Sequence, residues 1–234
     1  PWEPGSPDDW DLSDDRRFVS TPTQACATLT WDTLRYPLDD WSAYNMLTPL
    51  GQRYLASVRD LRIQGTVIPA DSGFRTSLSI VADGRTHRFD VGDGKAVLEI
   101  TGDGHTTTHT EPVEPFEAGT ATALRFQRVD QSMSIWINGV KQVELKWNDD
   151  PQQRLKQVGD KPAAPVVTWS FCGSSCTLTN MSVDRDLFYR GSLLMARSMK
   201  NPATDGFESL VQPGTPGFGN AADKLAVLGT EQLR

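Results

Sequence analysis

The chain has 234 residues, a net charge of −7 and 38% hydrophobic residues, which fits one large soluble domain or a domain with appendages. The negative charge argues against nucleic acid and against anionic membrane surfaces as partners. No run approaches the roughly 18 apolar residues of a membrane helix, and there is no basic-plus-apolar signal peptide. Because the sequence begins at Pro1 rather than Met, we expect a fragment or a processed product, with any anchoring segment outside it.

Residues 1–24 are predicted to form an irregular arm, because prolines interrupt them and acidic residues cluster among them. The isolated aromatic side chains of Trp2, Trp10 and Phe18 are expected to anchor this arm on the rest of the domain. The acids are interpreted as a solvated surface, since they lack the glycine-punctuated spacing of a calcium loop.

An aromatic-rich span follows, in which residues 28–31 are predicted to form a strand. Aromatic side chains at this density form either a sugar-stacking platform or the bulk of a core, and burial in a core is the more frequent outcome. The candidate ligand-binding residues from this span and from later strands are Trp41, Tyr44, Asn45, Trp136 and Trp147.

The middle of the chain alternates apolar and polar residues, which is the pattern of strands with one buried face. A strand is predicted over 58–69, followed by a meander whose Asp-Gly turns fall at residues 83, 93 and 103. Residues 121–140 then alternate through two further strands that end at Asn138-Gly139, a strong hairpin signal. Such strands must cover their apolar faces with a second sheet, so we predict an all-β, antiparallel two-sheet sandwich of the concanavalin A-like or jelly-roll kind.

Further strands are predicted after a polar loop at 148–164. Val167, Trp169 and Phe171 alternate in one of them, and a change of parity between Leu178 and Met181 indicates a bulge in the next. Beyond Tyr189 the glycine and proline content rises, which indicates a flexible connector and a final short strand. The predicted domains are the arm at 1–24, the sandwich at 25–190, and the connector and strand at 191–234.

No metal, cofactor or catalytic centre is predicted. His105 and His109 are separated by three threonines that favour an extended backbone, which places the two histidines more than about 12 Å apart. Glu111, Glu114 and Glu117 alternate with prolines in a loop, so no strand carries the paired carboxylates of a sandwich glycosidase.

The three cysteines are Cys26, Cys172 and Cys176. Cys172 and Cys176 can close a small loop through Gly-Ser-Ser, and a disulfide there would point to an oxidising compartment. Free thiols beside a strand end are the alternative interpretation, and two cysteines alone make a poor zinc site.

Four segments in order resemble the large insertion of signal peptidase I proteins of planctomycete-type bacteria. They are residues 40–45 (DWSAYN), 58–61 (VRDL), 125–130 with 135–139 (RFQRVD and IWING), and 184–189 (DRDLFY). The run Ala226-Val227-Leu228-Gly229 is similar to the one that precedes the peptidase's glycine-aspartate-asparagine box, although Thr230 and Glu231 depart from it. The resemblance implies a concanavalin A-like or laminin-G-like domain within a serine endopeptidase that uses a lysine base.

No residue here takes the peptidase's catalytic roles, because the run from Ser198 to Pro202 has one residue too many and is interpreted as coincidence. The resemblance therefore implies a non-catalytic module on the periplasmic side of the inner membrane. It would be anchored only through parent segments outside this sequence. Secreted precursor proteins or cell-envelope glycans are its expected partners.

The alternative hypothesis is a free-standing carbohydrate-binding, lectin-like module, motivated by the sandwich and by the seven tryptophans. It requires that some of the aromatic residues Trp31, Trp41, Tyr44, Trp147 and Trp169 lie exposed and coplanar. A glycosidase on the same scaffold is the weakest of the three interpretations.

Overall fold

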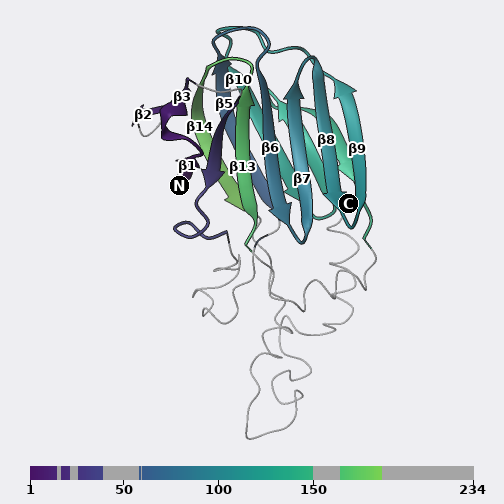
Figure 1. Cartoon of the computed structure of the whole chain (residues 1–234). Coiled ribbons are helices and arrows are strands. Elements are labelled where there is room, and N and C mark those ends of the chain that lie inside the picture. Colours follow the sequence, from purple (N-terminus) through teal and green to yellow (C-terminus); the bar gives the residue numbers. More distant parts are fainter. Residues whose placement is uncertain (15–16, 22–25, 39–57, 59, 150–163, 186–234) are drawn as a thin grey trace, which may run out of the picture. The chain divides into compact units, whose positions relative to one another are not determined.

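The computed structural model describes residues 1–14, 17–21, 26–38, 58, 60–149 and 164–185. All of them fall within one compact unit, and the predicted connector and strand at 191–234 lie outside the described residues. The described part forms two antiparallel sheets of seven strands each (Figure 1). The predicted all-β, two-sheet sandwich is therefore confirmed.

The first sheet has the strand order β1-β4-β13-β6-β7-β8-β9, and the second has the order β12-β11-β10-β5-β14-β3-β2. The strands of the first sheet are β1 (Trp2–Pro4), β4 (Cys26–Trp31), β13 (Val166–Cys172), β6 (Arg75–Ala82), β7 (Arg85–Gly92), β8 (Lys95–Gly102) and β9 (His105–Pro112). Those of the second are β12 (Val140–Lys146), β11 (Ser132–Ile137), β10 (Thr122–Val129), β5 (Leu61–Pro69), β14 (Cys176–Arg185), β3 (Arg17–Ser20) and β2 (Trp10–Asp14). Within the described ranges the only helix is η1 (Pro7–Asp9), and no described helix has the length and apolar character to cross a membrane.

The core lies between the sheets and is built from the inward positions of each strand. In β5 the burial alternates strictly from Leu61 to Pro69, as the period-two pattern predicts. Trp169 of β13 is fully buried, and its indole Nε1 donates a hydrogen bond to the Thr76 hydroxyl at 2.7 Å, so the polar edge of the ring is satisfied. Gly65 of β5 faces this ring: a Cβ there would lie only 3.0 Å from it.

The tight turns fall at the predicted Asp-Gly and Asn-Gly pairs. Asp83, Asp93, Asp103 and Asn138 each have φ between 50° and 56°, and each is followed by a glycine with positive φ. Asp and Asn tolerate this left-handed conformation better than other non-glycine residues, which is why they occupy these positions. The bulge is also confirmed, because the pairing of β14 with β5 shifts between Thr179 and Ser182, with Asn180 at φ 53°.

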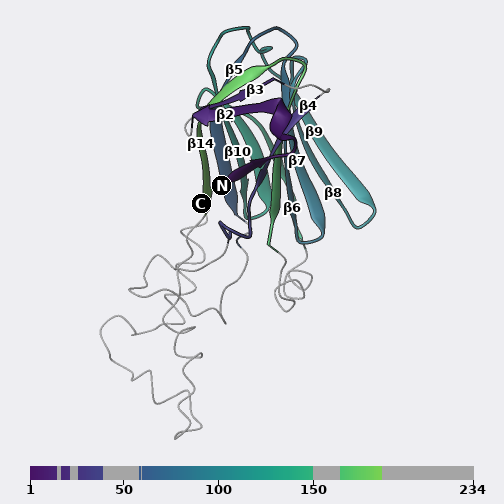
Figure 2. The ribbon, with the colours of Figure 1, turned by 60° about the vertical axis from the view of Figure 1, so that its left-hand side comes forward.

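The N-terminal segment differs from its prediction, because the described residues of 1–24 are mostly strand. β1 pairs with β4, and β3 pairs with both β14 and β2, so this segment extends both sheets; Figure 2 shows β2 and β3 beside β14. Trp2 and Trp10 are buried as predicted anchors. Strands of three to five residues are too short to display an alternating pattern, so the sequence alone suggested irregular structure.

The possible disulfide between Cys172 and Cys176 is not formed, and Cys176 is a free thiol. Cys172 is bonded to Cys26, its register partner on β4, at a sequence separation of 146. Cys172 follows the buried Phe171 and so lies on the outer face of β13, whereas Cys176 begins a strand of the other sheet with its side chain buried. The thiol of Cys176 accepts a hydrogen bond from the Ser20 hydroxyl at 3.3 Å, and burial raises its pKa to about 11.

Candidate functional site

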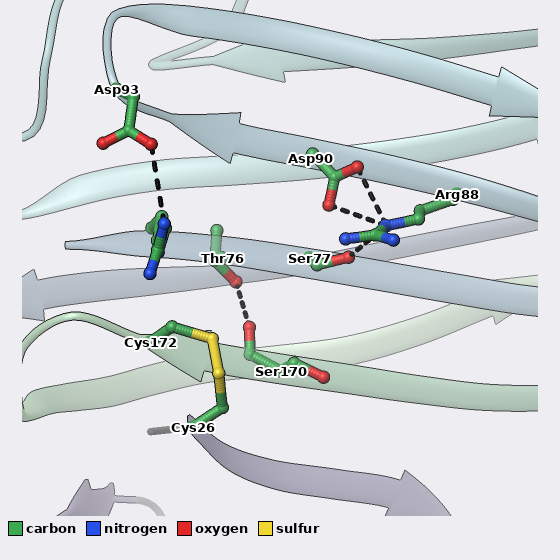
Figure 3. The surroundings of a disulfide bond; sticks show 9 residues. Cys26, Thr76, Ser77, Arg88, Asp90, Asp93, Ser170 and Cys172 are labelled. Atoms are coloured by element: carbon green, nitrogen blue, oxygen red, sulfur yellow. Dashed lines mark hydrogen bonds and ion pairs between the residues drawn. A yellow bond between two sulfur atoms is a disulfide. The ribbon is translucent and has the colours of Figure 1, made fainter. Parts of the chain in front are cut away.

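A groove of about 410 Å³ lies on the outer face of the first sheet, over β6, β7 and β8 and beside the Cys26–Cys172 disulfide (Figure 3). The strand register builds it, because Ser77, Asp90 and Val97 are neighbours across three adjacent strands. These side chains occupy outward positions, opposite the buried Leu78, Phe89 and Leu98. The same alternation that makes the core therefore presents the groove.

Arg88 and Asp90 are the central polar pair of the groove. The Arg88 Nε donates to Asp90 Oδ1 at 3.0 Å and to the Ser77 hydroxyl at 3.2 Å, which holds both side chains against the strands (Figure 3). The terminal nitrogens of Arg88 form no hydrogen bond with any described residue. They are free to donate to a ligand, while the carboxylate of Asp90 has acceptor capacity left over.

The rim carries three further charged residues. Arg75 and Asp93 form an exposed ion pair at 3.7 Å, and Lys95 has no ion pair with any described residue. Gly92 lies next to Arg75, and a Cβ at Gly92 would collide with the Arg75 side chain, so glycine permits this close approach. Together these residues give the groove donors, acceptors and a slight excess of positive charge.

The groove suits a hydroxyl-rich ligand. Its polar groups project from neighbouring paired strands, so they are held in place before a ligand arrives. An arginine and a carboxylate side by side can donate to one ligand oxygen and accept from the next, which matches neighbouring hydroxyls. Within the described ranges, no group of three or more His, Cys, Asp or Glu residues could hold a metal ion.

The structure does not gather the predicted ligand-binding residues in this groove. Trp136 lies on the outer face of the second sheet, and Trp147 follows β12 at the opposite end of the β11–β12 hairpin, where its Nε1 donates to Asp149 Oδ2 at 3.2 Å. Trp41, Tyr44 and Asn45 lie outside the described residues.

The aromatic platform required by the lectin-like hypothesis is not formed by the described tryptophans. Trp169 is fully buried, and Trp31 packs edge-to-face on Trp2 while its Nε1 donates to the Tyr36 carbonyl at 2.8 Å. The groove residues were not predicted from the sequence, because aromatic content was taken as the indicator of a binding site. The signal that marks them is Arg88-Phe89-Asp90, two charges flanking a core residue in one strand.

A second polar cluster lies where β7 meets β10, between the two sheets. His87 of β7 is buried, and its Nε2 accepts a hydrogen bond from the Arg128 Nε of β10 at 3.3 Å. Arg128 also pairs with Asp83 at 3.4 Å, and nearby Arg85 pairs with Asp149 at 2.7 Å. Burial and the Arg128 charge lower the pKa of His87 to about 4, so the imidazole is neutral at pH 7. This cluster ties one sheet to the other.

No protein-family model matches the chain, and no curated protein matches it. Among solved structures, the carbohydrate-binding module CBM66 from Bacillus subtilis is similar over 78% of this chain and 94% of its own, with a TM-score of 0.45 and 6% identity. The Caenorhabditis elegans galectin LEC-6 is similar over 74% of this chain and 99% of its own, with a TM-score of 0.39 and 16% identity. Sheep galectin-11, in complex with glycerol, is similar over 55% of this chain and 92% of its own, with a TM-score of 0.38 and 15% identity. Likeness at these TM-scores carries no argument about ligands, so the functional case rests on the groove itself.

Proposed function

We propose that this chain is a carbohydrate-binding β-sandwich module and that its ligand lies in the groove over β6, β7 and β8. The observation that carries the proposal is the Arg88–Asp90–Ser77 cluster, in which a guanidinium with free terminal nitrogens lies beside a carboxylate and a hydroxyl. A sugar presents hydroxyls that both donate and accept, and this cluster offers both complements within one short stretch of sheet. The volume of about 410 Å³ falls within the range of small-molecule sites.

The apolar part of the groove completes the recognition. Val97 and the Cys26–Cys172 disulfide line it beside the charged groups, so a ligand can place its C–H surface there while its hydroxyls reach Arg88 and Asp90. Apolar lining with a few placed polar groups is the usual composition of a ligand site.

The test is glycan binding by the full chain and by Arg88→Gln and Asp90→Asn variants, first on a glycan panel and then by calorimetry. A lost hydrogen bond to a charged group costs about 1.5–3 kcal/mol, so each variant should bind roughly 10- to 150-fold more weakly. Arg62→Gln is the matched control, because Arg62 forms an exposed ion pair with Asp184 at 3.0 Å on the other sheet. Absence of binding to every glycan, or unchanged affinity of both groove variants, would contradict the proposal.

The resemblance to the signal peptidase I insertion supports a separate proposal about the parent protein. In this proposal the module is part of a membrane-anchored, extracytoplasmic peptidase-like protein. The module binds or positions envelope glycans or precursor proteins for the peptidase part. The Cys26–Cys172 disulfide supports an oxidising compartment. The gene sequence on both sides of this chain tests the proposal, because a serine-methionine motif, a lysine box and a membrane helix are expected there.

A further inference from the structure

A second hollow lies on the outer face of the second sheet, away from the groove of the first. It has a volume of about 170 Å³ and is lined by outward residues of β5, β10 and β11 together with the bulge of β14, namely Gln64, Thr66, Ala123, Arg125, Trp136 and Asn180. The small side chain of Ala123 leaves room between its larger neighbours. The bulge contributes Asn180, which the left-handed φ of 53° places at the hollow.

The indole of Trp136 forms one wall and is held in a fixed orientation. Its Nε1 donates to the Ser134 hydroxyl at 3.0 Å, and the ring remains only partly buried. The Arg125 guanidinium lies over the ring at 5.5 Å from its centroid, and the Lys141 ammonium lies over the ring at 5.9 Å from the centroid. These cation–π contacts hold two positive charges beside the hollow, which favours a ligand that carries a negative substituent.

Arg125 has no carboxylate partner among the residues that the structure describes. Its neighbours are paired, Arg62 with Asp184 at 3.0 Å and Lys141 with Glu144 at 3.1 Å. The buried Nε of Arg125 has no hydrogen-bond partner among the described residues. The terminal nitrogens of Arg125 form no hydrogen bond with a described residue either, so they can donate to an acceptor from outside the chain.

The geometry points to a second binding site, at Trp136 and Arg125, for a carboxylated sugar ring such as a hexuronate. The sugar ring lies in the hollow beside the Trp136 indole, its carboxylate accepts hydrogen bonds from the terminal nitrogens of Arg125, and its hydroxyls meet the Gln64 and Asn180 amides and the Thr66 hydroxyl. The hollow has the volume of about six water molecules, which suits a single ring better than an extended chain. An acidic peptide side chain would use Arg125 but would leave the amides and the hydroxyl without partners.

The experiment is a titration of the ¹⁵N-labelled full chain with galacturonate and glucuronate, followed through the Trp136 indole N–H signal. That signal is assigned from the spectrum of Trp136→Phe. We expect saturable shifts with the uronates. Galactose and glucose should bind at least tenfold more weakly. Arg125→Gln should weaken uronate binding at least tenfold, whereas Arg62→Gln, which alters a paired arginine on the same face, should leave it unchanged.

Three outcomes would overturn this second site: no shift of the Trp136 signal with either uronate, equal affinity for acetate or for a glutamate-containing tripeptide, or unchanged affinity of Arg125→Gln. Its failure is separable from that of the first-sheet groove. Arg88→Gln is expected to weaken binding in the groove while leaving the uronate response of Trp136 intact.

Discussion

At the scale of single residues, the charge state of His87 is fixed by its surroundings. The ring is buried, and Arg128 donates to its Nε2, so the imidazole proton is assigned to Nδ1 and a second proton is disfavoured. The charged groups around it are Arg128, Arg85, Asp83 and Asp149. The two arginines oppose protonation, and Asp149 offsets them only in part.

Stability should therefore fall as the solution is acidified. The pKa of His87 is lowered to about 4, whereas an unfolded histidine titrates near 6.5. Between about pH 6.5 and pH 4 the unfolded chain therefore takes up a proton that the folded chain does not. From pH 7 to pH 5 this lowers the free energy of unfolding by about 2 kcal/mol. Urea melts of the wild type and of His87→Gln, which keeps an acceptor for Arg128, measure the effect. Equal pH dependence in the two proteins would contradict the account.

At the scale of elements, the hairpin between β11 and β12 depends on one asparagine. Asn138 adopts φ 50°, its N–H donates to the Ala123 carbonyl at 2.8 Å, and its side-chain oxygen accepts from the Ala123 N–H at 2.9 Å. One residue thus sets the turn and also joins it to the first residues of β10.

Replacing Asn138 by alanine should lower the free energy of unfolding by about 1–3 kcal/mol. The change forces a non-glycine residue other than Asn or Asp into the left-handed region and removes the side-chain acceptor. Asn138→Gly is the control, because it also removes the acceptor but adopts positive φ without strain. Its free energy of unfolding should fall by less than that of the alanine variant. Chemical denaturation compares the two variants. An alanine variant as stable as the glycine variant would show that the backbone conformation contributes nothing.

Long strands and their turns could be predicted from the sequence, because eight or nine alternating residues between Asp-Gly or Asn-Gly pairs specify both the strand and its register. The short strands β1, β2 and β3 could not, because their pairing partners β4 and β14 lie elsewhere in the chain and their own pattern is too brief. The groove was missed for a related reason. Ser77, Asp90 and Val97 become neighbours only once three strands are in register.

At the scale of the whole molecule, the first sheet pairs strands that are distant in the chain, and the disulfide links two of these strands covalently. β13 lies between β4 and β6 and is bonded to β4 through Cys26 and Cys172. From the sequence, a bond between Cys172 and Cys176 was one of two alternatives, because the Gly-Ser-Ser insert between them can turn sharply; free thiols were the other. The turn at Gly173 instead leads into the other sheet, which separates these two cysteines.

Removing the disulfide should therefore be costly. The bond closes a loop with a sequence separation of 146, and chain-entropy arguments for such loops give up to about 5 kcal/mol, with losses of about 2–5 kcal/mol typical of native disulfides. Cys26→Ser with Cys172→Ser should show this loss in thermal or urea melts, whereas Cys176→Ala should lose only about 1 kcal/mol. Peptide mapping without reduction should recover Cys26 linked to Cys172. A peptide linked through Cys172 and Cys176 would contradict the structure.

The most direct test of the proposed carbohydrate site on the first sheet is to map a bound glycan by amide chemical shifts on the labelled chain. We expect the largest changes on Ser77, Arg88, Asp90 and Lys95, with the inward residues of the same strands little affected. Changes confined to the second sheet, or spread evenly over the surface, would contradict the assignment of the groove as the principal binding site.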